Sequence, residues 1–238
     1  MYEKRWYRDL IKTDDLVTFE VVIEETDLLV MATKDLTSEV TKLVIEIREE
    51  LKRYIAVDPE FKESLVPYKI SADAPKIVKE MAEAAKIVGV GPMAAVAGAI
   101  AEYVGRRLLK NSKEVIVENG GDIFIKSLRK RKIGIYAGLS PLSNKITVEI
   151  DGQETPLGIC TSSGTVGHSL SFGKADAAMV LASSTALADA AATKIGNLVK
   201  QPEDIEQALE FAKTVTGLKG VIIIKDDRMG VWGDIKLV

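Results

Sequence analysis

The rest of the chain is organised around residues 158–197, GICTSSGTVGHSLSFGKADAAMVLASSTALADAAATKIGN. This stretch contains the single histidine of the sequence, His168, and its single cysteine, Cys160. It has a Thr/Ser/Gly turn at 161–165 and ends in an Ala-rich segment that predicts a helix over 184–199. So many small and polar residues around one histidine and a helical aspartate indicate a binding or catalytic site rather than packing.

Asp189 and Thr193 are the clearest pair in this stretch. They are four residues apart in the predicted helix and therefore share one of its faces. A carboxylate and a hydroxyl are hard oxygen ligands of the kind that Mg²⁺ prefers, with waters and ligand phosphates completing its octahedron. The alternative is structural: Asp189 then caps or solvates an early helical turn, and Thr193 bonds back to the backbone.

Thr161, Ser162, Ser163 and Gly164 form the polar turn that follows the first strand of the stretch. Gly164 permits a positive φ, and the hydroxyl and backbone N–H groups of such a turn can bind an anion such as phosphate. The same residues also suit an ordinary loop, so the sequence leaves both interpretations open.

His168 and Cys160 each allow two interpretations. His168 is a proton shuttle or a donor that positions a ligand, or it has a purely structural role. Cys160 is a reactive thiol, or it is a small buried strand residue. A serine hydrolase built from Ser163, His168 and Asp189 is disfavoured, because the chain lacks a G-x-S-x-G turn between a strand and a helix.

The composition excludes several classes of protein. The chain has 238 residues and a net charge of −3, which argues against general nucleic-acid binding. One cysteine excludes an intrachain disulfide framework and any cysteine-based metal centre. No apolar run reaches the length of a membrane span, and the charged start MYEKRWYRDL lacks the apolar core of a signal peptide. We therefore expect a cytoplasmic protein with no membrane or nucleic-acid partner.

Hydrophobic periodicity predicts strands, then helices, then strands, and finally helices and strands again. The first two strands are joined by Glu25-Thr26-Asp27, which is a hairpin signal. The apolar run VIIIK is expected inside a sheet. Strands are predicted over 16–24, 27–33, 113–118, 122–127, 131–137, 144–150, 156–161, 175–182, 219–224 and 229–237, and helices over 37–55, 75–88, 92–110, 184–199 and 202–214, with 57–71 irregular.

Glycines mark two further segments. Gly98 and Gly105 lie in the helix predicted over 92–110. A glycine weakens a helix, so each needs a reason, either close packing or room for a ligand. The four residues NGGD (119–122) lie between two predicted strands. They form either a plain hairpin turn or a backbone nest for an anion with an acid beside it.

Segregated hairpins and helices predict an α+β fold with antiparallel sheets and helices packed on one face. A doubly wound nucleotide-binding fold is disfavoured, because no G-x-G-x-x-G follows a first strand and no P-loop lysine is present. No repeat or linker divides the sequence. We therefore expect a single domain made of two intertwined halves, about 1–110 and 111–238.

Three motifs together resemble the ApbE family of Mg²⁺-dependent flavin transferases, and most closely a short branch of that family. They are ENGGDI (118–123) after a small-residue helix, TSSG (161–164) and ADAAAT (188–193). Proteins of that family cleave FAD and attach FMN to a Thr or Ser hydroxyl of a target protein. The resemblance implies an ApbE-like tandem of the T-fold type, which agrees with the order of elements predicted above.

The resemblance also implies roles for individual residues. Asp189 and Thr193 would bind the metal together with a nearby main-chain carbonyl, and Asp189 or His168 would assist the incoming hydroxyl. The remaining positions would bind the flavin nucleotide: Asn119, Gly120, Gly121 and Asp122 would shape the pocket, and Thr161, Ser162, Ser163 and Gly164 would line its phosphate side.

The sequence departs from the family pattern at two places. His168 is followed by Ser-Leu-Ser-Phe-Gly instead of an Asp-Pro continuation, and Glu102-Tyr103 stands where the family has Lys-Gly. Two functions therefore stay open. One is an enzyme that transfers FMN to an acceptor protein or cleaves a flavin or nucleotide pyrophosphate. The other is a non-catalytic accessory protein that binds a small ligand, in line with the branch's association with sulfur assimilation and homocysteine formation. In either case we expect a homo-oligomer, such as a homodimer.

Overall fold

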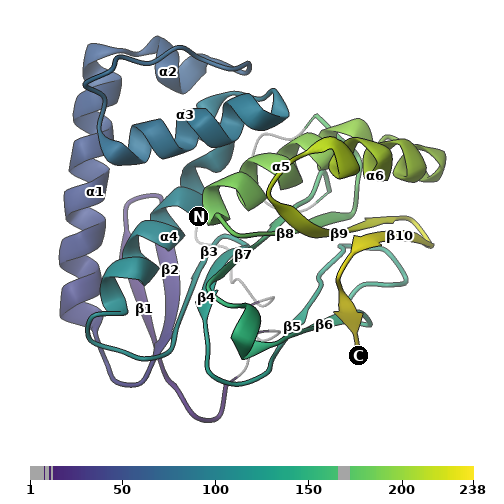
Figure 1. Cartoon of the computed structure of the whole chain (residues 1–238), viewed down its shortest axis with the longest axis horizontal. Coiled ribbons are helices and arrows are strands. Elements are labelled where there is room, and N and C mark those ends of the chain that lie inside the picture. The colour runs from purple at the N-terminus through teal and green to yellow at the C-terminus, as the bar shows by residue number, and fades with distance from the viewer. Residues whose placement is uncertain (1–7, 9–10, 12, 166–171) are drawn as a thin grey trace.

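The computed structural model describes residue 8, residue 11 and residues 13–165 and 172–238 of the chain. Two antiparallel sheets form its framework, and the long helices cover one face of the larger sheet (Figure 1). The predicted α+β class, with antiparallel sheets and helices on one face, is therefore confirmed.

The larger sheet is built from segments spread over the whole sequence. Its strands are β1 (Val17–Ile23), β2 (Thr26–Ala32), β3 (Val115–Asn119), β4 (Asp122–Lys126), β7 (Leu157–Ser162), β8 (Ala177–Ala182), β9 (Leu218–Lys225) and β10 (Arg228–Gly233). They lie side by side in this order, and every neighbouring pair is antiparallel. The β3–β4 hairpin thus lies next to β7, whose last two residues, Thr161 and Ser162, begin the TSSG segment.

The strand sequences explain their places in this sheet. Every residue of β2, β3 and β8 is buried, because elements cover both faces of the sheet there. The run VIIIK belongs to β9, which lies between β8 and β10, so its predicted interior position is confirmed. The predicted first hairpin is also confirmed: Ile23 pairs with Thr26, and Glu24 adopts a φ of 53° in the turn.

The helices agree with the predicted periodicity, with small changes at their ends. Gly89 ends the third helix with a φ of 76°, the left-handed conformation expected after a helix C-terminus. One prediction was wrong in part: the region 57–71 contains a short helix, which buries Phe61. The helices are α1 (Thr37–Val57), α2 (Glu60–Glu63), α3 (Lys76–Val88), α4 (Val96–Leu108), α5 (Thr185–Leu198) and α6 (Ile205–Thr214), with 3₁₀ turns η2 (Pro92–Ala95), η3 (Gly152–Glu154) and η4 (Pro202–Asp204).

The main hydrophobic core lies between the helices and the larger sheet. It joins residues of α1, such as Val44, to residues of α3, α4 and α5 and to sheet residues such as Val117 and Phe124. Gly105 of α4 faces the Phe124 ring so closely that a Cβ there would come within 2.1 Å of Phe124 Cδ1. Close packing of helix on sheet is therefore the reason for Gly105.

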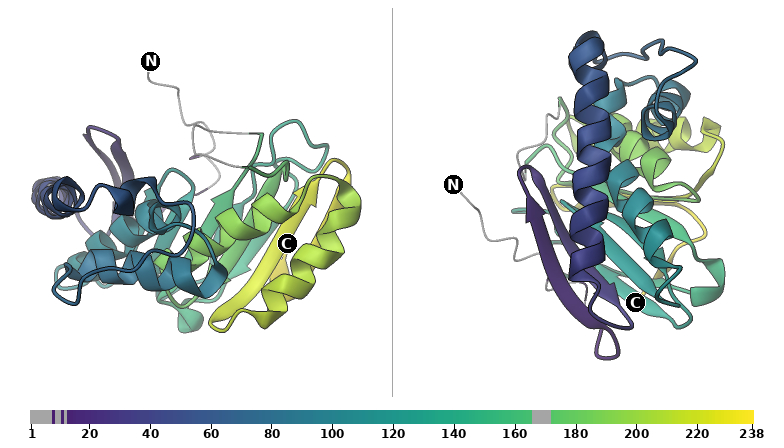
Figure 2. Two further views of the ribbon diagram at one scale, coloured as in Figure 1. Left: turned by 90° about the horizontal axis from the view of Figure 1, so that it is seen from above. Right: turned by 90° about the vertical axis from the view of Figure 1, so that its left-hand side faces the viewer.

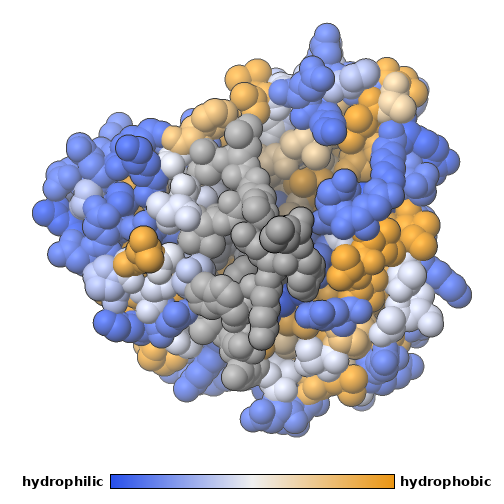
Figure 3. Space-filling view, turned by 180° about the vertical axis from the view of Figure 1, so that it is seen from behind, coloured by the Kyte–Doolittle hydropathy of each residue, from blue (hydrophilic) through white to orange (hydrophobic). Residues whose placement is uncertain are grey.

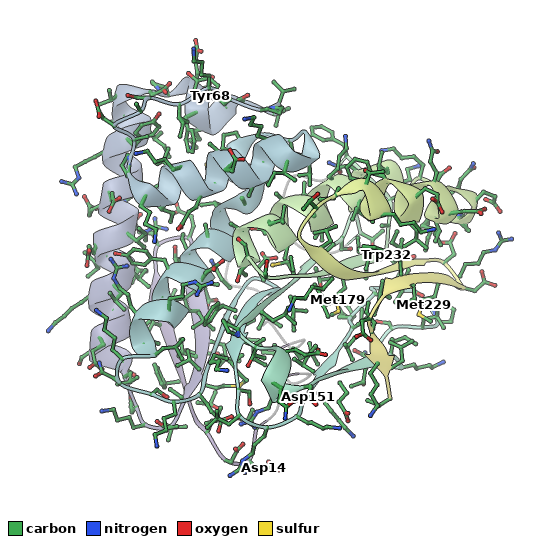
Figure 4. The ribbon with its side chains drawn as sticks, viewed as in Figure 1. Asp14, Tyr68, Asp151, Met179, Met229 and Trp232 are labelled. Carbon is green, nitrogen blue, oxygen red and sulfur yellow. The ribbon has the colours of Figure 1, made fainter. Side chains whose placement is uncertain are left out.

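A second core lies on the other face of the larger sheet, beneath a small sheet of β11 (Lys236–Leu237), β6 (Thr147–Ile150) and β5 (Arg131–Gly134). In Figure 1, β5 and β6 lie apart from β8 and β9, and Figure 2 shows the molecule from two further sides. In Figure 4, Met179 and Trp232 mark the two sides: Met179 belongs to the second core, and Trp232 packs against the main core.

The small sheet corrects one strand prediction. Residues 229–237 do not form a single strand, because β10 ends at Gly233 and the chain then turns to pair with β6. Gly233 has a φ of 93°, and a Cβ there would lie 2.2 Å from the Lys219 carbonyl oxygen. Only glycine fits this turn, and a glycine inside an alternating pattern is a sign of such a break.

On the face seen in Figure 3, hydrophobic residues form separate patches among hydrophilic ones. Among the described residues, no single helix is long and apolar enough to cross a membrane. The segments Lys76–Val88 and Pro92–Leu108 meet that criterion only as a pair, across a bend of 104°. Their apolar side chains contribute to the main core.

Candidate functional site

The sheet brings the three sequence motifs together. Asp122 at the start of β4 pairs with Cys160 of β7, and the Thr161 N–H donates to the Gly121 carbonyl oxygen at 3.3 Å. The NGGD turn and the TSSG segment are thus adjacent. Helix α5, which carries ADAAAT, packs directly on β7, where the Thr185 backbone is so close to Gly158 that a Cβ on Gly158 would lie 2.4 Å from Thr185 Cα. One small region therefore holds all three motifs.

The NGGD segment is a two-residue hairpin turn. Asn119 pairs with Asp122 across it, and Gly120 and Gly121 have φ values of 68° and 103°. Positive φ at both central positions is the reason that this turn uses glycine. The Gly121 N–H donates to Glu118 Oε1 at 2.7 Å, so an internal carboxylate already binds this amide.

Asp189 lies inside the protein, where helices α4 and α5 cross. Its side chain accepts a hydrogen bond from the Gly98 N–H at 2.8 Å. Gly98 is in the first turn of α4, whose N-terminal amides need partners, and the residue before that helix supplies no side-chain cap. A Cβ on Gly98 would lie 2.5 Å from the Thr185 carbonyl oxygen. Close packing of the two helices is therefore the reason for Gly98.

Asp122 and Asp189 form a buried acidic pair. Their residues are 8% and 9% exposed. Burial raises the pKa of Asp189 to about 7, although hydrogen bonds from the Gly98 and Ala97 backbone oppose the shift. Burial also raises the pKa of Asp122 well above its usual range, and the negative charges of Asp189 and Glu118 add to this. Both carboxyls thus favour a proton or a bound cation at neutral pH.

Other donors and acceptors surround this pair. The Asn119 side chain donates from Nδ2 to the Ala97 carbonyl oxygen at 3.0 Å. The Ala97–Gly98 peptide is therefore held on both sides, by Asn119 at its oxygen and by Asp189 at its nitrogen. Thr193 is half-buried on α5, one turn after Asp189.

Cys160 is fully buried beside the acidic pair. Its thiol donates to the Thr185 carbonyl oxygen at 3.4 Å. Burial raises the pKa of the Cys160 thiol well above its usual range, and the charges of Asp122 and Asp189 act in the same direction. The thiolate is thus disfavoured, which supports the buried strand residue over the reactive thiol.

Hydrogen bonds within the TSSG segment and to neighbouring residues hold its conformation. Ser163 Oγ accepts from the Thr165 N–H at 3.1 Å, and the Gly164 N–H donates to the Ala175 carbonyl oxygen at 2.9 Å. A Cβ on Gly164 would lie 2.2 Å from the Gly173 carbonyl oxygen. The TSSG segment and residues 173–175 therefore lie close together. His168 lies outside the described residues.

Sequence reasoning missed two charged groups near the motifs. Glu118, in β3, is 1% exposed, and its Oε2 accepts from Arg8 Nε at 2.7 Å. Arg8 also donates to the Asp27 carbonyl oxygen and to Asp27 Oδ1, at 2.8 and 2.9 Å. An acidic residue at the end of the apolar strand VIVEN was the available signal, because a buried carboxylate needs a partner.

Glu102, which departs from the family pattern, has a structural role in the fold. Its Oε2 accepts from the Thr185 N–H at 2.6 Å, at the N-terminus of α5. Its other oxygen pairs with Arg106 at 2.6 Å. A carboxylate at a helix N-terminus complements the helix dipole, so Glu102 joins α4 to α5.

The described residues contain no group of three or more His, Cys, Asp or Glu side chains that could hold a metal ion. Within the same part of the chain, the structure shows no ion pair for Asp122 or Asp189. The donors available to a cation here are thus two carboxylates, a threonine hydroxyl and backbone carbonyl oxygens. Such a set of hard oxygens suits Mg²⁺, which commonly keeps several waters and takes only one or two carboxylates.

Comparison with known proteins places these motifs in a family. The family model described as "AbpE bacteria" matches residues 8–231. The chain is 45% identical over 225 residues to a UPF0280 protein of Methanopyrus kandleri, covering 92% of this chain and 91% of the relative. It is 41% identical over 221 residues to a UPF0280 protein of Methanocaldococcus jannaschii, covering 90% of each.

Solved structures show the same fold at low sequence identity. The flavin transferase ApbE from Vibrio cholerae has a TM-score of 0.55 and 14% identity, with 91% of this chain and 96% of that chain covered. The flavinyl transferase ApbE of Pseudomonas stutzeri, in its apo form, has a TM-score of 0.55 and 15% identity, with coverages of 91% and 93%. At these identities the likeness establishes the fold.

Proposed function

We propose that this chain, which belongs to the ApbE-like family described as "AbpE bacteria", is a Mg²⁺-dependent enzyme that acts on the pyrophosphate of a flavin nucleotide. Transfer of FMN from FAD to a hydroxyl of an acceptor protein is the reaction we favour. Family membership supports the proposal, and so do the flavin transferases of Vibrio cholerae and Pseudomonas stutzeri, whose solved structures have the same fold.

The observation that carries the proposal is the buried pair of carboxylates, Asp122 and Asp189. They come from two different motifs, NGGD and ADAAAT, and both have raised pKa values. Two buried acids side by side are costly unless protons or a cation neutralise them. A cation bound at Asp189 would offset the negative charge of both carboxylates.

The donor set fits Mg²⁺. Asp189, Thr193 and a backbone carbonyl such as that of Ala97 are the residues that would hold it, and ligand phosphate and water would complete the shell. When bound, Mg²⁺ neutralises charge on a pyrophosphate and polarises its phosphorus.

The chain's own residues would bind and orient the nucleotide. The NGGD turn has no side chains at Gly120 and Gly121, so a ligand can approach its backbone closely. The hydroxyl groups of Thr161, Ser162 and Ser163 lie on the adjacent strand end and can donate to phosphate oxygens. We assign the removal of the proton from the attacking hydroxyl to Asp189 or His168.

A titration of FAD into the purified protein tests the proposal. Flavin fluorescence reports binding, and chromatography of the released AMP reports cleavage, each with Mg²⁺ and with EDTA. AMP release that requires Mg²⁺ is the expected result. Tight binding without AMP release, even with candidate acceptor proteins present, would replace this proposal with the second candidate function.

The second candidate is binding of a small ligand without catalysis. Glu102 favours it, because this position, where the family has a lysine, here holds a carboxylate that caps α5 and pairs with Arg106. At position 102, the positively charged lysine of the family pattern is thus replaced by a negatively charged glutamate that stabilises the start of α5. A protein with this function would keep its ligand through purification and would leave FAD intact.

A further inference from the structure

We propose that Arg8 is a positioning residue for the NGGD turn (residues 119–122) and that it acts through the carboxylate of Glu118. Two hydrogen bonds make the connection. Arg8 Nε donates to Glu118 Oε2 at 2.7 Å, and the Gly121 N–H donates to Glu118 Oε1 at 2.7 Å. The two oxygens of a single carboxylate thus join a side chain near the N-terminus to the backbone of the turn.

The other nitrogens of Arg8 fix the direction of its Nε. One terminal nitrogen donates to the carbonyl oxygen and to Oδ1 of Asp27, at 2.8 and 2.9 Å, and the other donates to Glu20 Oε1 at 3.2 Å. Because a guanidinium is planar and rigid, these bonds determine where Nε points. A lysine ammonium at the same position could not satisfy Glu118 and Asp27 with the same geometry.

Burial makes the contact between Arg8 and Glu118 strong. Their side chains are 8% and 1% exposed. Burial alone would lower the pKa of Arg8, but the Glu118 and Asp27 carboxylates outweigh this effect and raise it. Removal of the guanidinium takes a charged hydrogen-bond donor away from the buried Glu118 carboxylate. Glu118 Oε1 is then less firmly held in the position where it accepts from the Gly121 N–H.

The two glycines of the turn have no side chains of their own to hold them. Both have positive φ, and the turn depends on its backbone contacts and on the bond from the Gly121 N–H to Glu118 Oε1. The Gly121 carbonyl oxygen accepts from the Thr161 N–H at 3.3 Å, which transmits a shift of the turn to the TSSG segment. Arg8 therefore sets the conformation of one wall of the candidate site without touching the ligand.

The consequence for ligand affinity rests on the proposed function, whereas the effect on the turn does not. We therefore measure the turn first, in the protein without ligand. Amide hydrogen exchange at Gly121, followed by NMR, reports directly on the bond to Glu118. The variants are Arg8→Met, which keeps the bulk of the side chain, and Arg8→Lys, which also keeps the charge and folds more readily.

Arg131→Met is the matched control. Arg131 is also 8% exposed, and it also pairs with two acids, Asp15 and Glu114. It lies at the start of β5 in the small sheet, and its partners do not bond the NGGD turn. Each variant is measured at the same interval below its own melting temperature, so that a general loss of stability is cancelled.

In Arg8→Met we expect exchange at Gly121 to accelerate by about tenfold or more, the size expected when a hydrogen bond to a charged group is lost. In Arg8→Lys we expect a smaller acceleration, and in Arg131→Met none. Unchanged exchange at Gly121 in both Arg8 variants would overturn the proposal, as would an equal acceleration in Arg131→Met.

FAD affinity is measured with the same four proteins. We expect the dissociation constant to rise in Arg8→Met and to stay at the wild-type value in Arg131→Met. Faster exchange with unchanged FAD affinity would overturn the role of Arg8 in the site. If the wild-type protein does not bind FAD at all, the proposed function fails, and the exchange measurement still decides whether Arg8 positions the turn.

Discussion

The backbone N–H of Gly98 donates to Asp189 Oδ2 at 2.8 Å, and this bond joins the start of one helix to the inside of another. The two helices approach so closely because residue 98 has no side chain. The candidate metal ligand Asp189 is thus held by the packing of α4 on α5. Changes to that packing should therefore affect the site and the stability of the fold together.

Gly98→Ala is expected to destabilise the protein. The added Cβ would lie 2.5 Å from the Thr185 carbonyl oxygen and 2.8 Å from Asp189 Cβ, so the helices must move apart. Overpacking of this kind costs about 1–3 kcal/mol of unfolding free energy, measurable by urea denaturation. Gly196→Ala is the matched control, because its Cβ would meet nothing closer than 3.6 Å in a similar helix. Equal stability of the two variants would contradict the crowding at Gly98.

Asp189→Asn is expected to abolish Mg²⁺-dependent turnover of FAD while the protein stays folded. The loss should exceed the about 10–100-fold that is typical for removing a group outside the coordination shell. AMP release against Mg²⁺ concentration measures it. Asp151→Asn is the control, because Asp151 directly follows β6 of the small sheet and caps a 3₁₀ turn through the Gln153 N–H (Figure 4). Full turnover in Asp189→Asn would rule out the assigned role.

The unfolding free energy should depend on pH because Asp122 and Asp189 are buried acids with raised pKa values. The pKa of Asp189 is about 7 in the folded protein and about 4 for an unfolded carboxyl. The folded state therefore binds more protons between these values, and this group's contribution to the unfolding free energy falls as pH rises from about 4 to 7. We expect Asp189→Asn to show a smaller fall than wild type over that range, by denaturant unfolding with EDTA present. Parallel curves for the two proteins would contradict the raised pKa.

Mg²⁺ should restore the stability that the protein loses at higher pH, where the buried acids are ionised. At pH 8 a cation that binds only the folded state stabilises it by RT ln(1 + [Mg²⁺]/Kd), so the melting temperature rises with the logarithm of the Mg²⁺ concentration once this exceeds the dissociation constant. We expect this shift in wild type and not in Asp189→Asn. Ca²⁺, which takes more ligands at longer distances, serves as the comparison ion. An equal Mg²⁺ shift in both proteins would place the binding elsewhere.

Glu102→Ala is expected to weaken the start of α5. Loss of a residue that caps a helix costs about 0.5–2 kcal/mol, and here the Thr185 amide loses its acceptor. Glu102→Gln keeps an acceptor and should cost less. Glu102→Lys, which introduces the residue of the family pattern, should cost most, because a cation then faces both Arg106 and the positive end of the helix. Thermal melting of the three variants gives the order, and a stable Glu102→Lys would contradict it.

Cys160 should be inert in the folded protein. Its side chain is fully buried and its pKa is raised, so the reactive thiolate is scarce. We expect labelling by a thiol reagent to occur only on unfolding. Cys160→Ala combined with Leu139→Cys places a thiol at a fully exposed position and should react at once, which controls for the reagent. Fast labelling of the wild type in buffer would show that the site opens.

The sequence predicted the fold class and the three motifs because each depends on local patterns. The alternation of apolar and polar residues predicted the strands, and Gly120-Gly121 predicted a turn. The spacing of Asp189 and Thr193 predicted that both lie on one face of a helix. The partners of these residues could not be predicted, since Arg8 and Glu118 are 110 residues apart in the chain. The sequence alone cannot decide whether Gly98 allows close packing or makes room for a ligand, because the answer depends on the position of Thr185 in space.

The place of β4 between β3 and β7 has a consequence for how the protein is made. During synthesis β3 and β4 emerge together, but β5 and β6 must follow before β7 is available. Until then β4 has one bare edge of apolar residues, with Asp122 at its tip, and bare edges invite association with other chains. A nascent chain that stalls in this interval is thus expected to need chaperones, and yields from cells should improve when growth temperature is lowered.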